Sequence, residues 1–167
     1  MQRKMIKMIV TFTAVLMLGA VNAHAKQKTK TVPASAGVTD ADVVALADNL
    51  PAITEELNSY NGIEEDMGFD EIEEIIGKAE MRKVLNKHGI TGSDPNKKVN
   101  MIILCYAKFK VEKELEDAPF FLRSGIRKKL ENEFNANINP DDEKVVRRHS
   151  AYLDEKLCDF FGFDEED

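Results

Sequence analysis

The sequence has no tryptophan, and it has only two cysteines and three histidines among its 167 residues. The absence of tryptophan removes a side chain that is common in binding clefts. The cysteines, Cys105 and Cys158, are too far apart for C-x-x-C or C-x-x-C-H spacing. A thioredoxin-like redox centre and covalent haem attachment are therefore excluded as local motifs.

Motifs for catalysis and ion binding are also missing. The chain contains no G-x-S-x-G, S-x-x-K or H-E-x-x-H pattern and no glycine-rich phosphate loop. Its acidic runs, at 64–66, 70–74 and 164–167, lack the D-x-[DN]-x-[DN]-G spacing of a calcium loop. We therefore expect a protein that is not an enzyme and that carries no metal or cofactor.

One long apolar run is present, and it stands at the start of the chain. Arg3, Lys4 and Lys7 precede an uncharged stretch over 8–21, which is followed by the small-x-small site Ala23-His24-Ala25. The stretch is shorter than the roughly 20 residues that a membrane-spanning helix needs. We expect residues 1–25 to be a cleaved signal peptide rather than an anchor. The mature protein would be periplasmic or secreted, with no stable membrane insertion.

Negative charge dominates the remaining chain. The three basic residues of the leader leave 20 basic and 30 acidic residues after position 25, a formal net charge of −10. Nucleic acid is disfavoured as a partner because phosphate binding depends on clustered Lys and Arg. A cationic protein partner is compatible with this charge, although solubility is the plainer explanation.

The mature chain is long enough for one domain with a hydrophobic core. Residues 26–37 lack periodicity and predict a flexible leader. The helical patterns fill residues 38–163, and residues 164–167 form an acidic tail that we expect to be frayed.

The first predicted helix begins at a capping box, in which Thr39 is the N-cap and Asp42 stands three residues later. Apolar residues then recur every three or four positions as far as Tyr60, which predicts an amphipathic helix. Pro51 predicts either a kink or two abutting helices near Asn49.

Further helices are predicted at 70–76, 79–88, 95–116, 118–135 and 140–162. The helix at 95–116, capped by Ser93 or Asp94, is apolar nearly all the way round, which is typical of a central buried helix. Asn139 and Pro140 give the last helix a strong start signal. There is no period-2 alternation, so we expect an all-α fold. It would be a single compact bundle-like or orthogonal domain of five to six helices.

Two kinds of polar residue are candidates for a special role. In an oxidising compartment Cys105 and Cys158 are predicted to form a disulfide, and the alternative is two separate buried thiols. His149, on the apolar stripe of the last helix, is a candidate ligand or pH-sensing group, or simply a partly buried histidine. His88 is explained by its position at a helix C-terminus.

The C-terminal aromatic cluster is a candidate binding surface. Phe160 and Phe163, with Phe121 from the preceding helix, would form an apolar patch beside His149 if they are exposed. Packing at helix ends is the simpler explanation.

The leading functional hypothesis is an exported, non-catalytic helical binding protein for a protein client or a small apolar ligand, held in an interhelical groove. A first alternative is an acidic inhibitor or neutralising protein of a cationic exported hydrolase. A second is a cofactor-dependent enzyme or electron carrier, for which Met101 and His149 are haem-ligand candidates by residue type alone.

Overall fold

A computed structural model describes residues 32–64, 67–117 and 136–157 together with Arg127 and Phe134. The chain divides into two units, Met1–Lys30 and Thr31–Asp167, and every described residue belongs to the second. The described residues contain no strand, which confirms the predicted all-α class. Their helices are α2 (Asp40–Asn58), α3 (Phe69–Ile76), α4 (Lys78–Lys87), α5 (Pro95–Asp117), α7 (Pro140–Arg148) and α8 (Ser150–Leu157).

Several predicted segments fall outside these ranges. The signal peptide, most of the predicted helix at 118–135, and the acidic tail are among them. None of the described helices is both long enough and apolar enough to cross a membrane.

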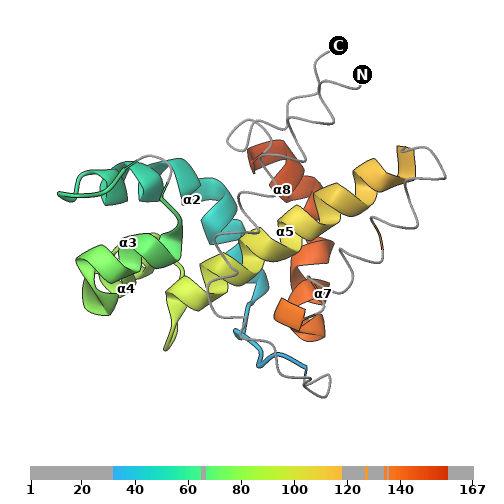
Figure 1. Ribbon diagram of the computed structural model, residues 1–167, viewed down its shortest axis with the longest axis horizontal. Helices are drawn as coiled ribbons and strands as arrows, with labels where there is room; N and C mark the ends of the chain where they lie inside the picture. Colours follow the sequence, from blue (N-terminus) through green and yellow to red (C-terminus); the bar gives the residue numbers. More distant parts are fainter. Residues whose placement is uncertain (1–31, 65–66, 118–126, 128–133, 135, 158–167) are drawn as a thin grey trace, which may run out of the picture. The chain divides into compact units, whose positions relative to one another are not determined.

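Helix α5 is the central helix, as its sequence predicts. It packs against α2, α3, α4, α7 and α8. In Figure 1, α3 and α4 lie near its N-terminal end, while α7 and α8 lie along its middle and C-terminal part. Val99, Ile102 and Tyr106 on α5 are almost completely buried. Asp94 rather than Ser93 caps this helix, because its Oδ1 accepts the Lys97 N–H at 3.1 Å.

Helix α2 begins at the predicted capping box. The Thr39 N–H donates to Asp42 Oδ2 at 2.9 Å, and the Asp42 N–H donates to Thr39 Oγ1 at 3.3 Å. The helix then runs without interruption past Pro51 to Asn58, so the alternative of two abutting helices is wrong. Pro51 is exposed, and a fully buried row beginning at Val43 continues on both sides of it. Burial of one continuous apolar face therefore outweighs the lost backbone hydrogen bond.

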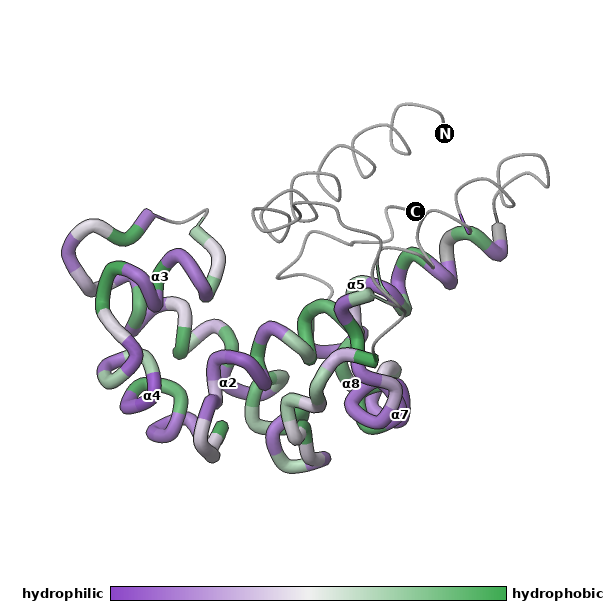
Figure 2. Tube along the Cα trace, turned by 60° about the horizontal axis from the view of Figure 1, so that its bottom comes forward, coloured by the Kyte–Doolittle hydropathy of each residue, from purple (hydrophilic) through white to green (hydrophobic). Residues whose placement is uncertain are grey.

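The two short helices α3 and α4 lie where the sequence predicts them. Gly77 separates them with a φ of +83°, a conformation that favours glycine. Met81, Val84 and Leu85 of α4 face inward as expected and are almost fully buried. Figure 2 shows the same alternation of hydrophobic and hydrophilic residues along the helices, as one buried face requires.

The prediction of a single helix over 140–162 is wrong, because two helices, α7 and α8, occupy residues 140–157. Asn139 caps α7 as expected, accepting the Asp141 N–H at 2.9 Å. The helix then stops at His149, whose N–H bonds to the Val146 carbonyl at 3.0 Å, and α8 begins at Ser150. The apolar stripe continues across the break, since Val146 and Leu153 are both buried. The regular spacing of apolar residues therefore gave no sign of the break between the two helices.

Candidate functional site

The most strongly connected polar region lies where the N-terminal ends of α2, α5 and α7 are joined by residues 33–39, and we call it the polar junction. Asp142, on α7, is 2% exposed and accepts three hydrogen bonds. They come from Ser35 Oγ at 2.8 Å, the Ala36 N–H at 2.7 Å and the Val38 N–H at 3.0 Å. Residues 35, 36 and 38, at the end of the predicted leader and the start of the helical region, are thus hydrogen-bonded to α7.

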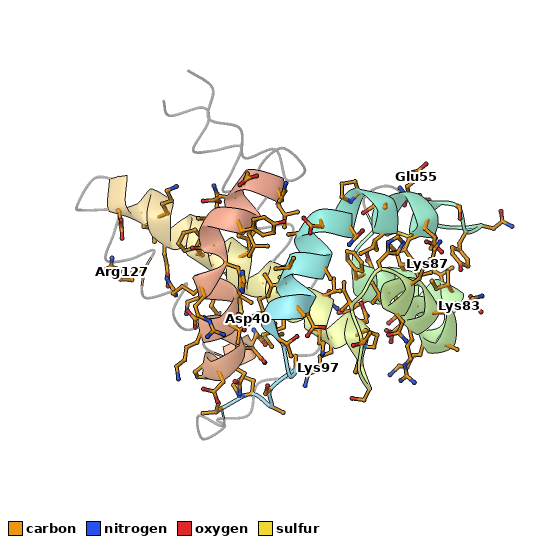
Figure 3. All side chains as sticks on the ribbon, turned by 180° about the vertical axis from the view of Figure 1, so that it is seen from behind. Asp40, Glu55, Lys83, Lys87, Lys97 and Arg127 are labelled. Atoms are coloured by element: carbon orange, nitrogen blue, oxygen red, sulfur yellow. The ribbon has the colours of Figure 1, made fainter. Side chains whose placement is uncertain are left out.

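The same segment is held by α5 and by the cap of α7. Lys97 Nζ donates to the carbonyls of Ala34 and Ser35 at 3.2 and 3.1 Å, and Figure 3 labels this lysine. Asn139 Nδ2 donates to the Pro33 carbonyl at 2.8 Å. These contacts depend on residues more than 60 positions away, so local composition could not predict them.

Asp42 is the second buried carboxylate of the polar junction. Lys98 Nζ donates to its Oδ2 at 2.8 Å, and the two side chains are 12% and 3% exposed. Burial alone would raise the pKa of Asp42. The hydrogen bonds from Lys98 and Thr39 outweigh it, and they hold the pKa below its ordinary value.

The polar junction stabilises the fold. Asp42 and Asp142 each stand at the third position of a helix, where the helix dipole favours negative charge. An external anion would bind at such helix ends, but here the chain's own carboxylates hold those positions.

His88 and His149 each contact an acidic residue of α2. His88 Nε2 lies 2.9 Å from Glu56 Oε2, which Lys87 also approaches at 2.8 Å. His149 Nε2 lies 2.7 Å from Asp40 Oδ1. These contacts fasten the ends of α4 and α7 to opposite ends of α2. A ligand or pH-sensing role for His149 remains a prediction.

No three histidine, cysteine, aspartate or glutamate side chains within the described ranges form a group that could hold a metal ion.

Cys105 is a buried thiol on α5. Burial, followed by the negative charge of Glu143, raises its pKa to about 12. It lines a cavity of about 10 Å³ between α5, α7 and α8, which is space for a single water molecule. A thiol with such a high pKa is a poor nucleophile. Cys158 lies outside the described residues, so the disulfide remains a prediction.

Charged side chains link α5 to α7. Lys108, only 9% exposed, places its Nζ 2.9 Å from both carboxylate oxygens of Glu143. Arg147 lies 2.8 Å from Glu143 and 2.8 Å from Glu112. The hydrogen bonds from Arg147 and Lys108 hold the pKa of Glu143 below its ordinary value, although burial opposes them. A groove lies beside these pairs along α5, and the pairs hold one of its walls in place.

That groove has a volume of about 290 Å³. Its α5 wall comes from one face of the helix, at positions 108, 111, 112, 115 and 116. The apolar part consists of Val111, Leu115 and Phe134, of which Leu115 and Phe134 are 7% and 1% exposed. We call this hollow the α5 groove.

Four charged residues also line the α5 groove. Lys108 and Glu112 are engaged in the ion pairs with α7. Glu116 and Arg127 are exposed, and neither pairs with any residue that the structure describes. Figure 3 labels Arg127 beside the C-terminal part of α5. Among the described residues, the groove thus combines an apolar floor with one unpaired charge of each sign.

Sequence reasoning did not single out the α5 groove. The predicted surface, Phe121, Phe160 and Phe163, lies outside the described residues and stays untested. Arg127 and Phe134 both fall within the predicted helix at 118–135. The available signal was the i, i+3, i+4, i+7 spacing from Lys108 to Leu115, which mixes apolar and charged residues.

Acidic residues are concentrated in α2 and α3. Between Lys30 and Lys78 the sequence has twelve acidic residues and no Lys or Arg. Glu55, Glu64 and Glu74 are exposed and have no partner among the described residues. Figure 3 shows Glu55 pointing outward from α2. Twelve of the thirty acidic residues of the chain therefore lie in this one stretch.

The fold and the site define a class: an all-helical chain with a groove beside its central helix. No protein-family model, curated protein or solved structure matches the sequence or the fold.

Proposed function

We propose that the protein is an exported, non-catalytic helical binding protein that holds a small apolar ligand in the α5 groove. The observation that carries this proposal is the volume of about 290 Å³ over an apolar floor. Ligand pockets usually measure about 300–1,000 Å³, so the groove suits a ligand at the small end of that range. The charged network between α5 and α7 supports the proposal because it fixes one wall in advance of binding.

The non-catalytic part of the proposal is supported by the state of the reactive groups. The Cys105 thiol is buried and its pKa is raised to about 12, so it is poorly suited to nucleophilic attack. Lys108 and Glu143, the buried charges nearest the groove, neutralise each other at 2.9 Å.

Export is supported by the leader pattern of residues 1–25. Cleavage after Ala25 would leave residues 26–32 between the new N-terminus and the segment held by Asp142. The mass of the protein from the exported fraction tests this step. A mature chain starting at Lys26 is expected, and a mass that retains residues 1–25 contradicts cleavage.

A groove-filling substitution tests the binding site. Val111 is half-buried in the wall of the α5 groove, so Val111→Trp places a large ring in the hollow. We expect it to weaken binding of a fluorescent apolar probe at least tenfold. Ile75→Trp is the matched control, because Ile75 is 46% exposed on α3 and does not line the groove. Equal probe affinity in the two variants would refute the site.

A second candidate function, an acidic inhibitor or neutralising protein of a cationic exported hydrolase, is favoured by the charge of α2 and α3. Its test is binding to basic hydrolases at increasing salt concentration. The triple variant Glu55→Gln, Glu64→Gln, Glu74→Gln should bind more weakly, and the wild-type affinity should fall steeply with salt. Salt-insensitive binding would count against this function.

A further inference from the structure

The chemical class of the ligand follows from Glu116 and Arg127, the two charged residues of the α5 groove that have no partner in the described part of the chain. Positions 108 and 116 mark its ends on α5, and eight residues at 1.5 Å each give a length of about 12 Å. That length and the apolar floor suit one short hydrocarbon arm. A lipid with two long chains would exceed the volume of about 290 Å³.

The charges select among ligands that have such an arm. A neutral ligand that covers the groove would remove water from Arg127 and Glu116 without giving either a partner. A ligand with a single charge would satisfy one of them and oppose the other. A ligand that carries both charges satisfies both, since guanidinium binds carboxylate and carboxylate binds ammonium.

We propose that the α5 groove binds a small zwitterion with one apolar arm, of the class of α-amino acids with long apolar side chains. The carboxylate of the ligand binds Arg127, its ammonium binds Glu116, and its arm lies on Val111, Leu115 and Phe134. Lys108 and Glu112 do not take part, because Glu143 and Arg147 already engage them. This assignment rests on the proposed function, since it requires the groove to bind a ligand.

Four compounds with an arm of similar length test the assignment: 1-octanol, octanoate, octylamine and 2-aminooctanoate. Their affinities for the mature chain are measured by isothermal titration calorimetry at neutral pH. We expect 2-aminooctanoate to bind most tightly, at least threefold better than either singly charged compound. Exposed ion pairs contribute modest free energies, which correspond to about this ratio.

Two substitutions assign the partners. Arg127→Gln should remove the advantage of 2-aminooctanoate over octylamine, and Glu116→Gln should remove its advantage over octanoate. Glu55→Gln is the matched control for Glu116→Gln, because Glu55 is also exposed and unpaired within the described residues and does not line the groove. It should leave all four affinities unchanged.

The outcomes separate the assignment from the function on which it rests. If no compound binds, the proposed function fails and the assignment fails with it. If octanol or a singly charged compound binds as tightly as 2-aminooctanoate, the groove is a binding site and the zwitterion assignment is overturned. If Arg127→Gln and Glu116→Gln both leave the ranking unchanged, the assignment is overturned as well.

Discussion

At the residue scale, Asp42 and Asp142 are the most consequential polar side chains that the structure describes. Each is 2% exposed and accepts several hydrogen bonds at the start of a helix. Removing one partner of a buried hydrogen bond costs more free energy than the bond contributes when it is present, because the remaining group is left buried and unpaired. Substitutions at these positions should therefore be costly for stability.

Asp142→Asn should lower the free energy of unfolding by about 2–3 kcal/mol. The amide keeps one acceptor but places an NH₂ group against donors that now bind the carboxylate, namely Ser35 Oγ and the Ala36 and Val38 N–H groups. Urea denaturation measures the change. Asp141→Asn is the control, because its side chain is 84% exposed, and it should cost less than 1 kcal/mol. Equal effects of the two substitutions would contradict the role of Asp142.

Stability should fall in acid because buried carboxylates titrate below their ordinary pKa. Burial would raise the pKa of Asp42, but Lys98 and Thr39 outweigh it, so the folded pKa lies below the ordinary value of 3.8. Burial likewise opposes the lowering of the pKa of Asp154, which Tyr106 and Lys110 bring about. A lowered folded pKa gives stability that is complete above the unfolded value and is lost as pH falls through the folded value.

The free energy of unfolding should therefore be nearly constant from pH 7 to about pH 5 and should decrease steadily below about pH 4. Urea denaturation in pH steps provides the measurement. Lys98→Met removes the cation that lowers the pKa of Asp42, so this variant should be less stable at pH 7 and lose less on acidification. Stability that rises between pH 5 and pH 3 would contradict this account.

The Cys105 thiol should be almost unreactive in the folded protein. Its raised pKa of about 12, against an ordinary value of 9.0, leaves a far smaller thiolate fraction at pH 8. In a Cys158→Ser variant, we expect labelling by iodoacetamide to be roughly a thousandfold slower when folded than in urea, since each pKa unit changes the thiolate fraction tenfold. Comparable rates in the two states would show that Cys105 is accessible.

At the element scale, the residues that mark helix starts gave the most reliable predictions from the sequence. The Thr39–Asp42 box and the Asn139 cap are local hydrogen bonds between residues two or three positions apart, so their pattern is visible without the fold. The break between α7 and α8 was missed, and the residue at the break has a distant contact. His149 stands beside Asp40, 109 positions earlier in the chain.

Gly89 is where the connection from α4 to α5 passes close to α2. Its φ is +87°, and a Cβ there would lie 3.3 Å from Ala45 Cβ. Gly89→Ala should therefore cost about 2 kcal/mol or more, from the left-handed backbone and from the close approach together. Gly37→Ala is the control, with a φ of +70° but no atom within 4 Å, and it should cost only about 1 kcal/mol. The difference between their denaturation midpoints measures the contact, and identical midpoints would rule it out.

At the scale of the whole molecule, residues 33–38 join the start of the domain to α7. The Ala36 N–H donates to Asp142 Oδ2 at 2.7 Å, so Ala36→Pro removes a donor to a buried carboxylate. We expect the free energy of unfolding of this variant to be about 1–2 kcal/mol lower than that of the wild type. Ala34→Pro, which replaces an exposed residue whose N–H has no partner among the described residues, should have a smaller effect. If residues 33–38 contribute nothing to the stability of the fold, Ala36→Pro and Ala34→Pro will have the same free energy of unfolding.

The sequence by itself determined the all-α class, the positions of α2, α3, α4 and α5, the central place of α5 and the caps of α2 and α7. These features depend on 3.6-residue periodicity and on hydrogen bonds within one turn, which are local properties. The tertiary structure alone decided the attachment of residues 33–36 to Asp142, the break at His149 and the α5 groove. Each of these joins residues that are distant in the sequence, and their proximity depends on how the helices pack.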